Sequence, residues 1–223
     1  MVFRRRRRFT NRRRAFGRIP RAINRVPFKS SHYEPGTEKK SYTDYSTANL
    51  INNGVIARSS MVSGICQGVG DDERVGRKLQ VKNILLHSFI TTSDNATYNS
   101  FPYRIMLVLD TQANNSGVTL TELLQDIGTS YSDFLSFQNL YHQKRFVVLK
   151  DIKGVTRQGG WNGTTFKSAH TLCNMNVKCN IPIIYNGDAG TYADLPQNNI
   201  VLVGWAEHAA TLHYNMRIRY TDK

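Results

Sequence analysis

Acidic residues are missing from the start of the chain, since no Asp or Glu precedes Glu34. The sequence also has no long apolar run, whereas a membrane-spanning helix needs about 20 consecutive apolar residues. The apolar core of a secretory signal does not follow the N-terminal charges either. We therefore expect no transmembrane segment and no secretory signal at this end of the chain.

Residues that carry common chemistries are equally scarce. The three cysteines, Cys66, Cys173 and Cys179, form no CxxC pair, and the six histidines show no HExxH or HxxxH spacing. Cys173 and Cys179 would lie about 20 Å apart along a continuous strand, too far for a disulfide. The glycines of residues 68–78 do not have P-loop spacing. We predict no catalytic residue, no cofactor site, no metal site and no enzyme activity. Residues 71–73 leave one alternative open, because this acidic loop is either solvated or holds a Ca²⁺ ion.

Positive charge, by contrast, is abundant and unevenly distributed. The chain has 30 Lys and Arg against 16 Asp and Glu, for a net charge of +14. Residues 1–29 hold twelve of these basic residues, which leaves 18 basic and 16 acidic residues in the rest of the chain. The twelve are Arg4, Arg5, Arg6, Arg7, Arg8, Arg12, Arg13, Arg14, Arg18, Arg21, Arg25 and Lys29. The sequence therefore predicts a polycationic arm on a nearly neutral body.

The arm is typical of a disordered interaction segment, because its like charges repel and its few apolar residues cannot offset chain entropy. Guanidinium groups pair with phosphates and stack on bases. Phe3, Phe9 and Phe16, which interleave with the arginines, are suited to stacking on single-stranded bases. We predict that the twelve basic residues bind nucleic acid without reading its sequence, and nuclear-localisation activity is compatible with this.

Other partners fit the arm less well. A membrane anchor needs a hydrophobic face, and a mitochondrial presequence is amphipathic and rich in serine. The arm has neither a clean apolar stripe nor a serine before Ser30. A solvated tail without any partner is the remaining alternative.

The body reads as β structure. Apolar residues alternate with polar ones from Leu212 to Tyr220 and from Cys173 to Tyr185, the pattern of half-buried strands. The alternation changes phase within residues 79–91, which predicts a β-bulge near Lys82 and Asn83. Pro182 cannot donate to a ladder and is expected at an edge, a bulge or a strand end.

Three apolar runs, residues 103–110, 145–151 and 199–206, suggest strands buried on both faces or deep in a sandwich. The stretch TLTELLQDI, which begins at Thr119, predicts one short helix within a loop. Many strands with long loops and little helix indicate an antiparallel sandwich or a jelly roll.

Several segments then resemble a known family in order and spacing. They are the arginine-rich residues 4–25, RVGRKLQVKNILL (74–86), YRIMLVLDTQ (103–112), KRFVVLKDIK (144–153), VKCNIPIIYNG (177–187), IVLVGWA (200–206) and RIRYTD (217–222). On these residues the chain resembles the capsid proteins of small circular Rep-encoding single-stranded DNA viruses, the group that includes circoviruses, geminiviruses and nanoviruses.

The resemblance implies an all-β fold: a single eight-stranded antiparallel jelly roll with BIDG and CHEF sheets and a disordered basic N-terminal arm. Residues 1–45 are expected to form the arm and linker, and residues 46–223 the jelly-roll capsid domain. The strands are expected at 61–66 (B), 77–92 (C), 102–111 (D), 144–153 (E), 171–181 (F), within 182–195 (G), 199–207 (H) and 211–221 (I).

The resemblance also implies a function. The chain is expected to be a coat protein that self-assembles into a sixty-subunit T=1 icosahedral shell, with the arm inside on single-stranded nucleic acid, DNA in preference to RNA. Its expected location is the virion, with assembly in the host nucleus. The host receptor is unknown, and no membrane partner is expected. Two alternatives stay open: a satellite-virus-like coat protein that packages RNA, and a non-viral basic-tailed β-sandwich that binds nucleic acid.

Overall fold

The computed structural model describes residues 38–50, 58–92, 100–113, 117–125, 132–157, 159–165 and 167–222. The chain divides into two units, Met1–Glu34 and Pro35–Lys223, and every described residue belongs to the second. The predicted disordered arm lies outside the described residues. Within them, no helix has the length and apolar character needed to cross a membrane.

The described residues form nine strands and two short helices. The strands are β1 (Glu38–Leu50), β2 (Arg58–Met61), β3 (Lys78–Thr92), β4 (Ser100–Asp110), β5 (Phe146–Arg157), β6 (His170–Leu172), β7 (Met175–Ile184), β8 (Asn199–Ala206) and β9 (Ala210–Asp222). The helices are α1 (Leu120–Leu123) and α2 (Ser132–Leu135). Thr119 is the N-cap of α1, which confirms the helix predicted from that residue.

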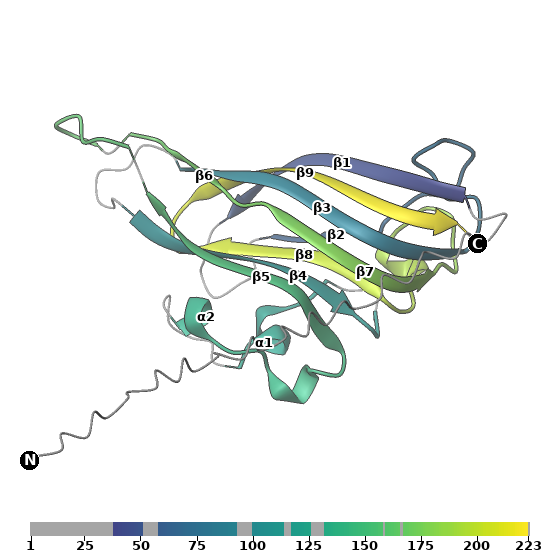
Figure 1. Cartoon of the computed structure of the whole chain (residues 1–223). Coiled ribbons are helices and arrows are strands. Elements are labelled where there is room, and N and C mark those ends of the chain that lie inside the picture. The colour runs from purple at the N-terminus through teal and green to yellow at the C-terminus, as the bar shows by residue number, and fades with distance from the viewer. Residues whose placement is uncertain are drawn as a thin grey trace, which may run out of the picture. The chain divides into compact units, whose positions relative to one another are not determined.

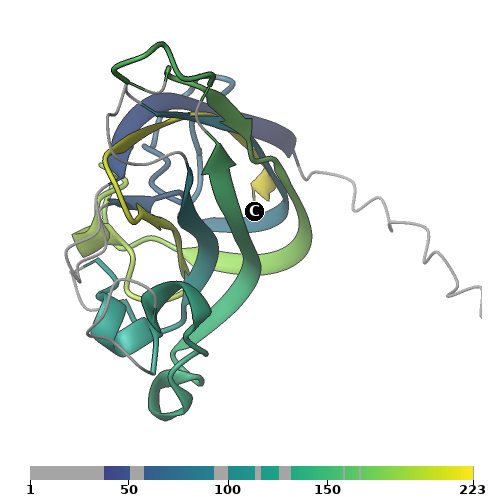
Figure 2. The ribbon, with the colours of Figure 1, turned by 90° about the vertical axis from the view of Figure 1, so that its left-hand side faces the viewer.

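The strands lie in two facing antiparallel sheets, seen as two layers in Figure 1 and from the side in Figure 2. One sheet has the order β1-β9-β3 followed by β6 and β7, and the other has the order β2-β8-β4-β5. Both β6 and β7 pair with β3, one after the other along its length, so they share one strand position. The fold is therefore the predicted eight-stranded jelly roll, with β1-β9-β3-β6/β7 as the BIDG sheet and β2-β8-β4-β5 as the CHEF sheet.

The strand assignments need one correction. Strand B is β1 and not residues 61–66, because β2 ends at Met61 and takes the place of strand C in the CHEF sheet. The segments expected as C, D, E and F are consequently D, E, F and G. Strand G, expected within 182–195, is the interrupted pair β6 and β7. Strands H and I lie where they were expected.

Strand β1 escaped prediction because its inward positions are only partly apolar. Lys40 and Asp44 occupy inward positions, and only Ala48 and Leu50 are buried apolar residues there. An edge strand tolerates this pattern, because one of its sides has no neighbour to pack against it. The predicted division at residue 45 remains a prediction, although β1 pairs with β9 from Glu38 onward.

The finer predictions on individual strands hold with one exception. The pairing register of β3 shifts between Val81 and Asn83, which confirms the bulge. Pro182 is exposed in β7, at the edge of its sheet. Strand β8 is buried along its whole length, as its apolar run indicated. Strand β5 instead lies at the edge of the CHEF sheet with most residues partly exposed, so two-sided burial was wrong for its 145–151 segment.

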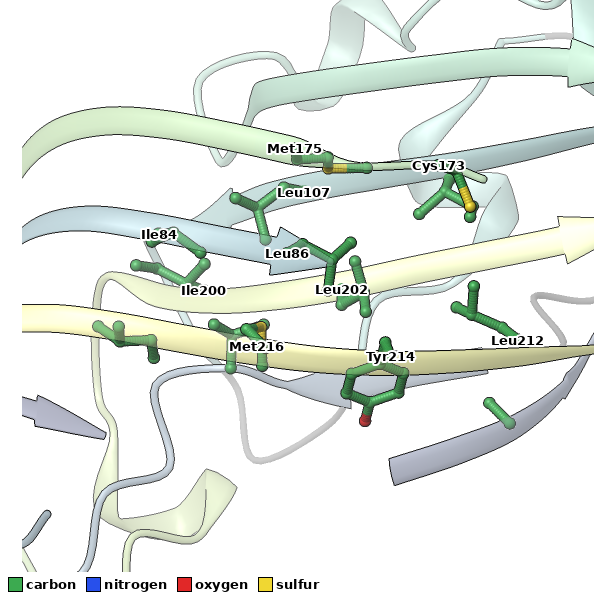
Figure 3. Packing of buried hydrophobic residues seen from close by; sticks show 14 of the residues in the cluster. Ile84, Leu86, Leu107, Cys173, Met175, Ile200, Leu202, Leu212, Tyr214 and Met216 are labelled. Carbon is green, nitrogen blue, oxygen red and sulfur yellow. The ribbon is translucent and has the colours of Figure 1, made fainter. Parts of the chain in front are cut away.

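The main core fills the space between the sheets. Side chains from β3, β7 and β9 point towards those of β4 and β8 (Figure 3). The central ones are Ile84, Leu86, Met175, Leu212, Met216, Leu107, Ile200 and Leu202. All of these are buried, because period-two alternation places every second residue of a strand on the same face.

A second core covers the opposite face of the CHEF sheet. Met106 of β4 and Trp205 of β8 pack there with apolar residues from α1 and α2. Those partners include Leu123 and Phe134, whose ring lies 6.1 Å from that of Trp205. Part of the connection between β4 and β5 therefore covers the outer face of the CHEF sheet.

Candidate nucleic-acid interface and assembly surface

All twelve basic residues predicted to bind nucleic acid, Arg4 to Lys29, lie outside the described residues. Their role stays a prediction. The described residues contain a further basic surface and an apolar surface that the sequence analysis did not single out.

The basic surface is the outer face of the BIDG sheet. Its six exposed basic side chains are Lys39 of β1, Lys78 and Lys82 of β3, Lys178 of β7, and Arg217 and Arg219 of β9. Arg219 lies opposite Ser41 and Asn83, and Asn83 lies opposite Lys178. We call this surface the basic face.

No acidic residue lies on the basic face along the described strands. Asp44 and Asp222 belong to the inward-facing rows of β1 and β9, opposite Met216 and Glu38 respectively. Arg217 is oriented by a neutral partner, since its Nε donates to the Thr43 hydroxyl at 3.1 Å. A run of like charge without local compensation attracts a polyanion.

Two arginines on the side of the second core have carboxylate partners. Arg104 pairs with Asp151 at 2.8 Å, and Arg145 contacts Asp110 at 3.0 Å and Glu122 at 3.1 Å. The hydrogen bond with Asp110 raises the pKa of Arg145 despite partial burial. These arginines anchor the connection between β4 and β5, and they are not available to a polyanion.

Arg74, the first residue of the RVGRKLQVKNILL segment, is also structural. It is fully buried, donates through Nε to Ile65 O at 3.0 Å and through Nη1 to Gly76 O at 2.9 Å. Its guanidinium carbon lies 4.0 Å from the ring centre of Tyr185, whose pKa is raised by burial. Arg74 thus ties the segment before β3 to the segment after β7.

The acidic loop at residues 71–73 folds back on itself. Gly70 N donates to the Glu73 carboxylate at 2.9 Å, and the Lys40 ammonium donates to the carbonyls of Gly70 and Glu73. Across the described part of the chain, no group of three or more His, Cys, Asp or Glu side chains is placed to hold a metal ion. The three cysteines are free thiols.

An apolar surface lies on the segment from α2 to the 3₁₀ turn Leu140–His142. It consists of Leu135, Phe137, Leu140 and Tyr141, which are 75%, 78%, 64% and 94% exposed. Exposed apolar side chains that gather in one place mark interaction sites, and these four lie within seven consecutive residues. We call these four residues the 135–141 patch.

The backbone under the 135–141 patch is firmly held. Ser136 O accepts a hydrogen bond from buried Arg104 at 2.9 Å, and Phe137 O accepts one from Gln125 N at 3.0 Å. Asn139 N donates to Leu123 O at 2.9 Å. Phe134 and Ser136, which flank Leu135 in the sequence, are buried, so the patch is presented outward by a fixed segment.

Comparison with known proteins gives one finding. The family model of the satellite tobacco necrosis virus coat protein matches residues 34–223, which include every described residue. No curated protein matches the chain.

Proposed function

The chain belongs to the satellite tobacco necrosis virus coat protein family, and from this premise we propose that it assembles into a closed icosahedral shell around a single-stranded genome. As a viral coat protein it is a structural component of the virion. The non-enzymatic prediction agrees with this family. The single observation that carries the packaging proposal is the concentration of twelve basic residues in residues 1–29 of a chain whose remainder is nearly neutral.

We favour RNA as the packaged nucleic acid. The resemblance to circular DNA viruses predicted DNA, but the matched family is that of a satellite virus, and jelly rolls of small plant satellite viruses package RNA. The charges of the arm and the basic face act on phosphates and do not distinguish the two polymers. Assembly in the host nucleus followed from the DNA virus resemblance, and the family match gives it no support.

We propose a T=1 shell of sixty copies. Sixty arms with twelve basic residues each supply about 720 positive charges, which offset a sizeable share of the phosphates in a small genome. Assembly needs surfaces that recognise another copy of the chain, and the 135–141 patch is our candidate for one of them. Its apolar and aromatic composition is typical of the buried centre of a protein–protein interface.

Removal of the arm tests the packaging proposal. Deletion of residues 2–29 should leave a folded body that no longer protects nucleic acid from nuclease. In a full-length control, lysine replaces the eleven arginines of the set and keeps the charge; in the matching neutral variant, glutamine replaces all twelve basic residues. We expect the lysine variant to package and the glutamine variant to fail.

Electron microscopy of the purified protein, with the 260/280 nm absorbance ratio before and after nuclease, provides the readout. Nuclease-resistant particles are expected from the wild type, and digestion of the extracted polymer by RNase but not DNase identifies RNA. A truncated protein that still protects nucleic acid at the wild-type level would show that the arm is not required. A protein that stays monomeric would favour the non-viral alternative.

A further inference from the structure

A hollow of about 290 Å³ opens on the outer face of the BIDG sheet, beside the basic residues of β9. Its lining includes Tyr45 of β1, His213 of β9, and His87 and Phe89 of β3. The volume is close to the lower limit of about 300 Å³ for small-molecule pockets. The hollow therefore suits a single planar group better than a large ligand.

The hollow lies beside the point where the edge strand is interrupted between β6 and β7. The side-chain oxygen of Asn174 accepts a hydrogen bond from Ser88 N at 3.0 Å, and Cys173 N donates to Ser88 O at 2.9 Å. A side chain thus replaces a backbone carbonyl in the ladder at this point. Leu172, which also lines the hollow, is 75% exposed.

Aromatic rings dominate the hollow. The rings of Phe89 and His213 are stacked, with centroids 4.7 Å apart and an interplanar angle of 14°. His170, which is not part of the lining, meets Phe89 edge-on, with a centroid distance of 5.6 Å. Tyr45 is 72% exposed at the rim. Such rings are the usual platform on which bases of single-stranded nucleic acid stack.

Side chains suited to phosphate lie next to these rings, in one row along β9. Asn215 lines the hollow, and Arg217 follows it two residues later on the same face of β9, a spacing of about 7 Å along a strand. Arg219 continues the same row. A nucleotide whose base enters the hollow can therefore place its phosphates among these guanidinium groups.

We propose that the hollow binds a base of the packaged single strand by stacking, an inference that rests on the proposed function. The arm is a poor occupant, because its twelve positive charges would lie against the acid-free basic face. An occupant with negative charge and planar rings matches both halves of the site, and single-stranded nucleic acid has both.

Two oligonucleotides separate base binding from phosphate binding. The full-length protein is titrated with a fluorescent 12-mer of uridylate and with an abasic 12-mer of the same charge, at a salt concentration where binding is reversible. Phe3, Phe9 and Phe16 are first changed to leucine, because these arm residues can also stack. We expect this background protein to bind the uridylate about tenfold more tightly than the abasic strand.

Single substitutions then test whether the hollow is the source of the preference for uridylate over the abasic strand. Phe89→Leu keeps the apolar volume but removes the ring, and Tyr45→Ser alters an exposed side chain. Either change should lower the uridylate preference at least threefold and leave abasic binding unchanged. Trp161→Leu is the matched control, since Trp161 is 53% exposed outside the hollow, and it should leave the preference unchanged. Thermal melting verifies that each variant is folded.

This inference would be overturned if the background protein bound the two strands equally. It would also be overturned if neither hollow variant changed the preference for uridylate. Neither outcome would contradict the proposal that the protein packages nucleic acid. Loss of particles in Tyr45→Ser with the preference unchanged would identify the hollow as a subunit contact and also overturn it. If neither strand binds the wild type and no particles form, the proposed function fails as well.

Discussion

The two outer faces of this sandwich have opposite characters. The outer face of the CHEF sheet is covered by α1, α2 and the segment that follows, with Trp205 and Phe134 in a second apolar core. The outer face of the BIDG sheet is polar and basic, and no acidic residue compensates Arg217 or Arg219 along the described strands. The same strand alternation therefore supports two different roles.

Charge distribution follows the same division. Arg104 and Arg145, near the covered face, have the carboxylate partners Asp151 and Asp110, because a buried charge is costly without a partner. On the basic face the charges remain in water, where they need no partner for stability. No carboxylate neutralises these charges along the described strands, so they suit a polyanion such as the nucleic acid that we propose as the ligand.

The largest effect is expected at the 135–141 patch, beyond the covered face. Phe137→Asp combined with Tyr141→Ser places polar groups on side chains that are 78% and 94% exposed, so folding should be unaffected. A charge buried in an apolar interface is strongly unfavourable. We expect particles to be absent by electron microscopy and subunits to sediment as small species.

Trp161→Ser is the control for this variant, because it alters an exposed aromatic side chain outside the patch. Normal particles from the Phe137→Asp, Tyr141→Ser protein would remove the patch from the assembly surface. Loss of particles from the control as well would indicate a general effect on solubility.

The covered face is tested at Trp205, which is fully buried in the second core. Trp205→Ala should lower the free energy of unfolding by about 3–5 kcal/mol, the usual cost of a large aromatic cavity. Asn215→Ala, on the exposed face of β9, should change it by less than about 0.5 kcal/mol. Urea unfolding measures the effect of each substitution on the free energy of unfolding, in the Phe137→Asp, Tyr141→Ser protein that does not assemble. Equal effects of the two substitutions would show that the two outer faces do not differ in their contribution to stability.

The smallest effect is expected on the basic face itself. Arg217→Ala with Arg219→Ala should weaken binding of uridylate and abasic strands alike by a few-fold. The slope of log K against log salt should become shallower by about 1.4, because each lost phosphate contact on a single strand contributes about 0.7. Lys144→Ala with Lys150→Ala, two exposed residues outside the basic face, is the matched control. An unchanged slope would show that the face does not touch phosphates.

Much of the fold was predictable because strand alternation is a local property. The rows of β9 and β7, the bulge at Lys82 and the helix after Thr119 all follow from the order of neighbouring residues. Strand β1 was not predictable in this way. Its inward Lys40 and Asp44 hide the period of two, and only pairing with β9 reveals the strand.

The candidate surfaces were less predictable than the fold. The basic residues of β1, β3, β7 and β9 are scattered between Lys39 and Arg219, and nothing in their spacing joins them. Phe137 and Tyr141 resemble ordinary core residues in the sequence. The exposed fraction that sets them apart depends on which neighbours the fold supplies.

The sequence alone determined the uneven distribution of charge and the β character of the body, since composition and alternation need no knowledge of distant contacts. Only the tertiary structure decided that the connection between β4 and β5 covers one sheet and leaves the other bare. It also gathered Tyr45, Phe89 and His213 around one hollow. The physical reason is that exposure and proximity result from the packing of segments far apart in the chain.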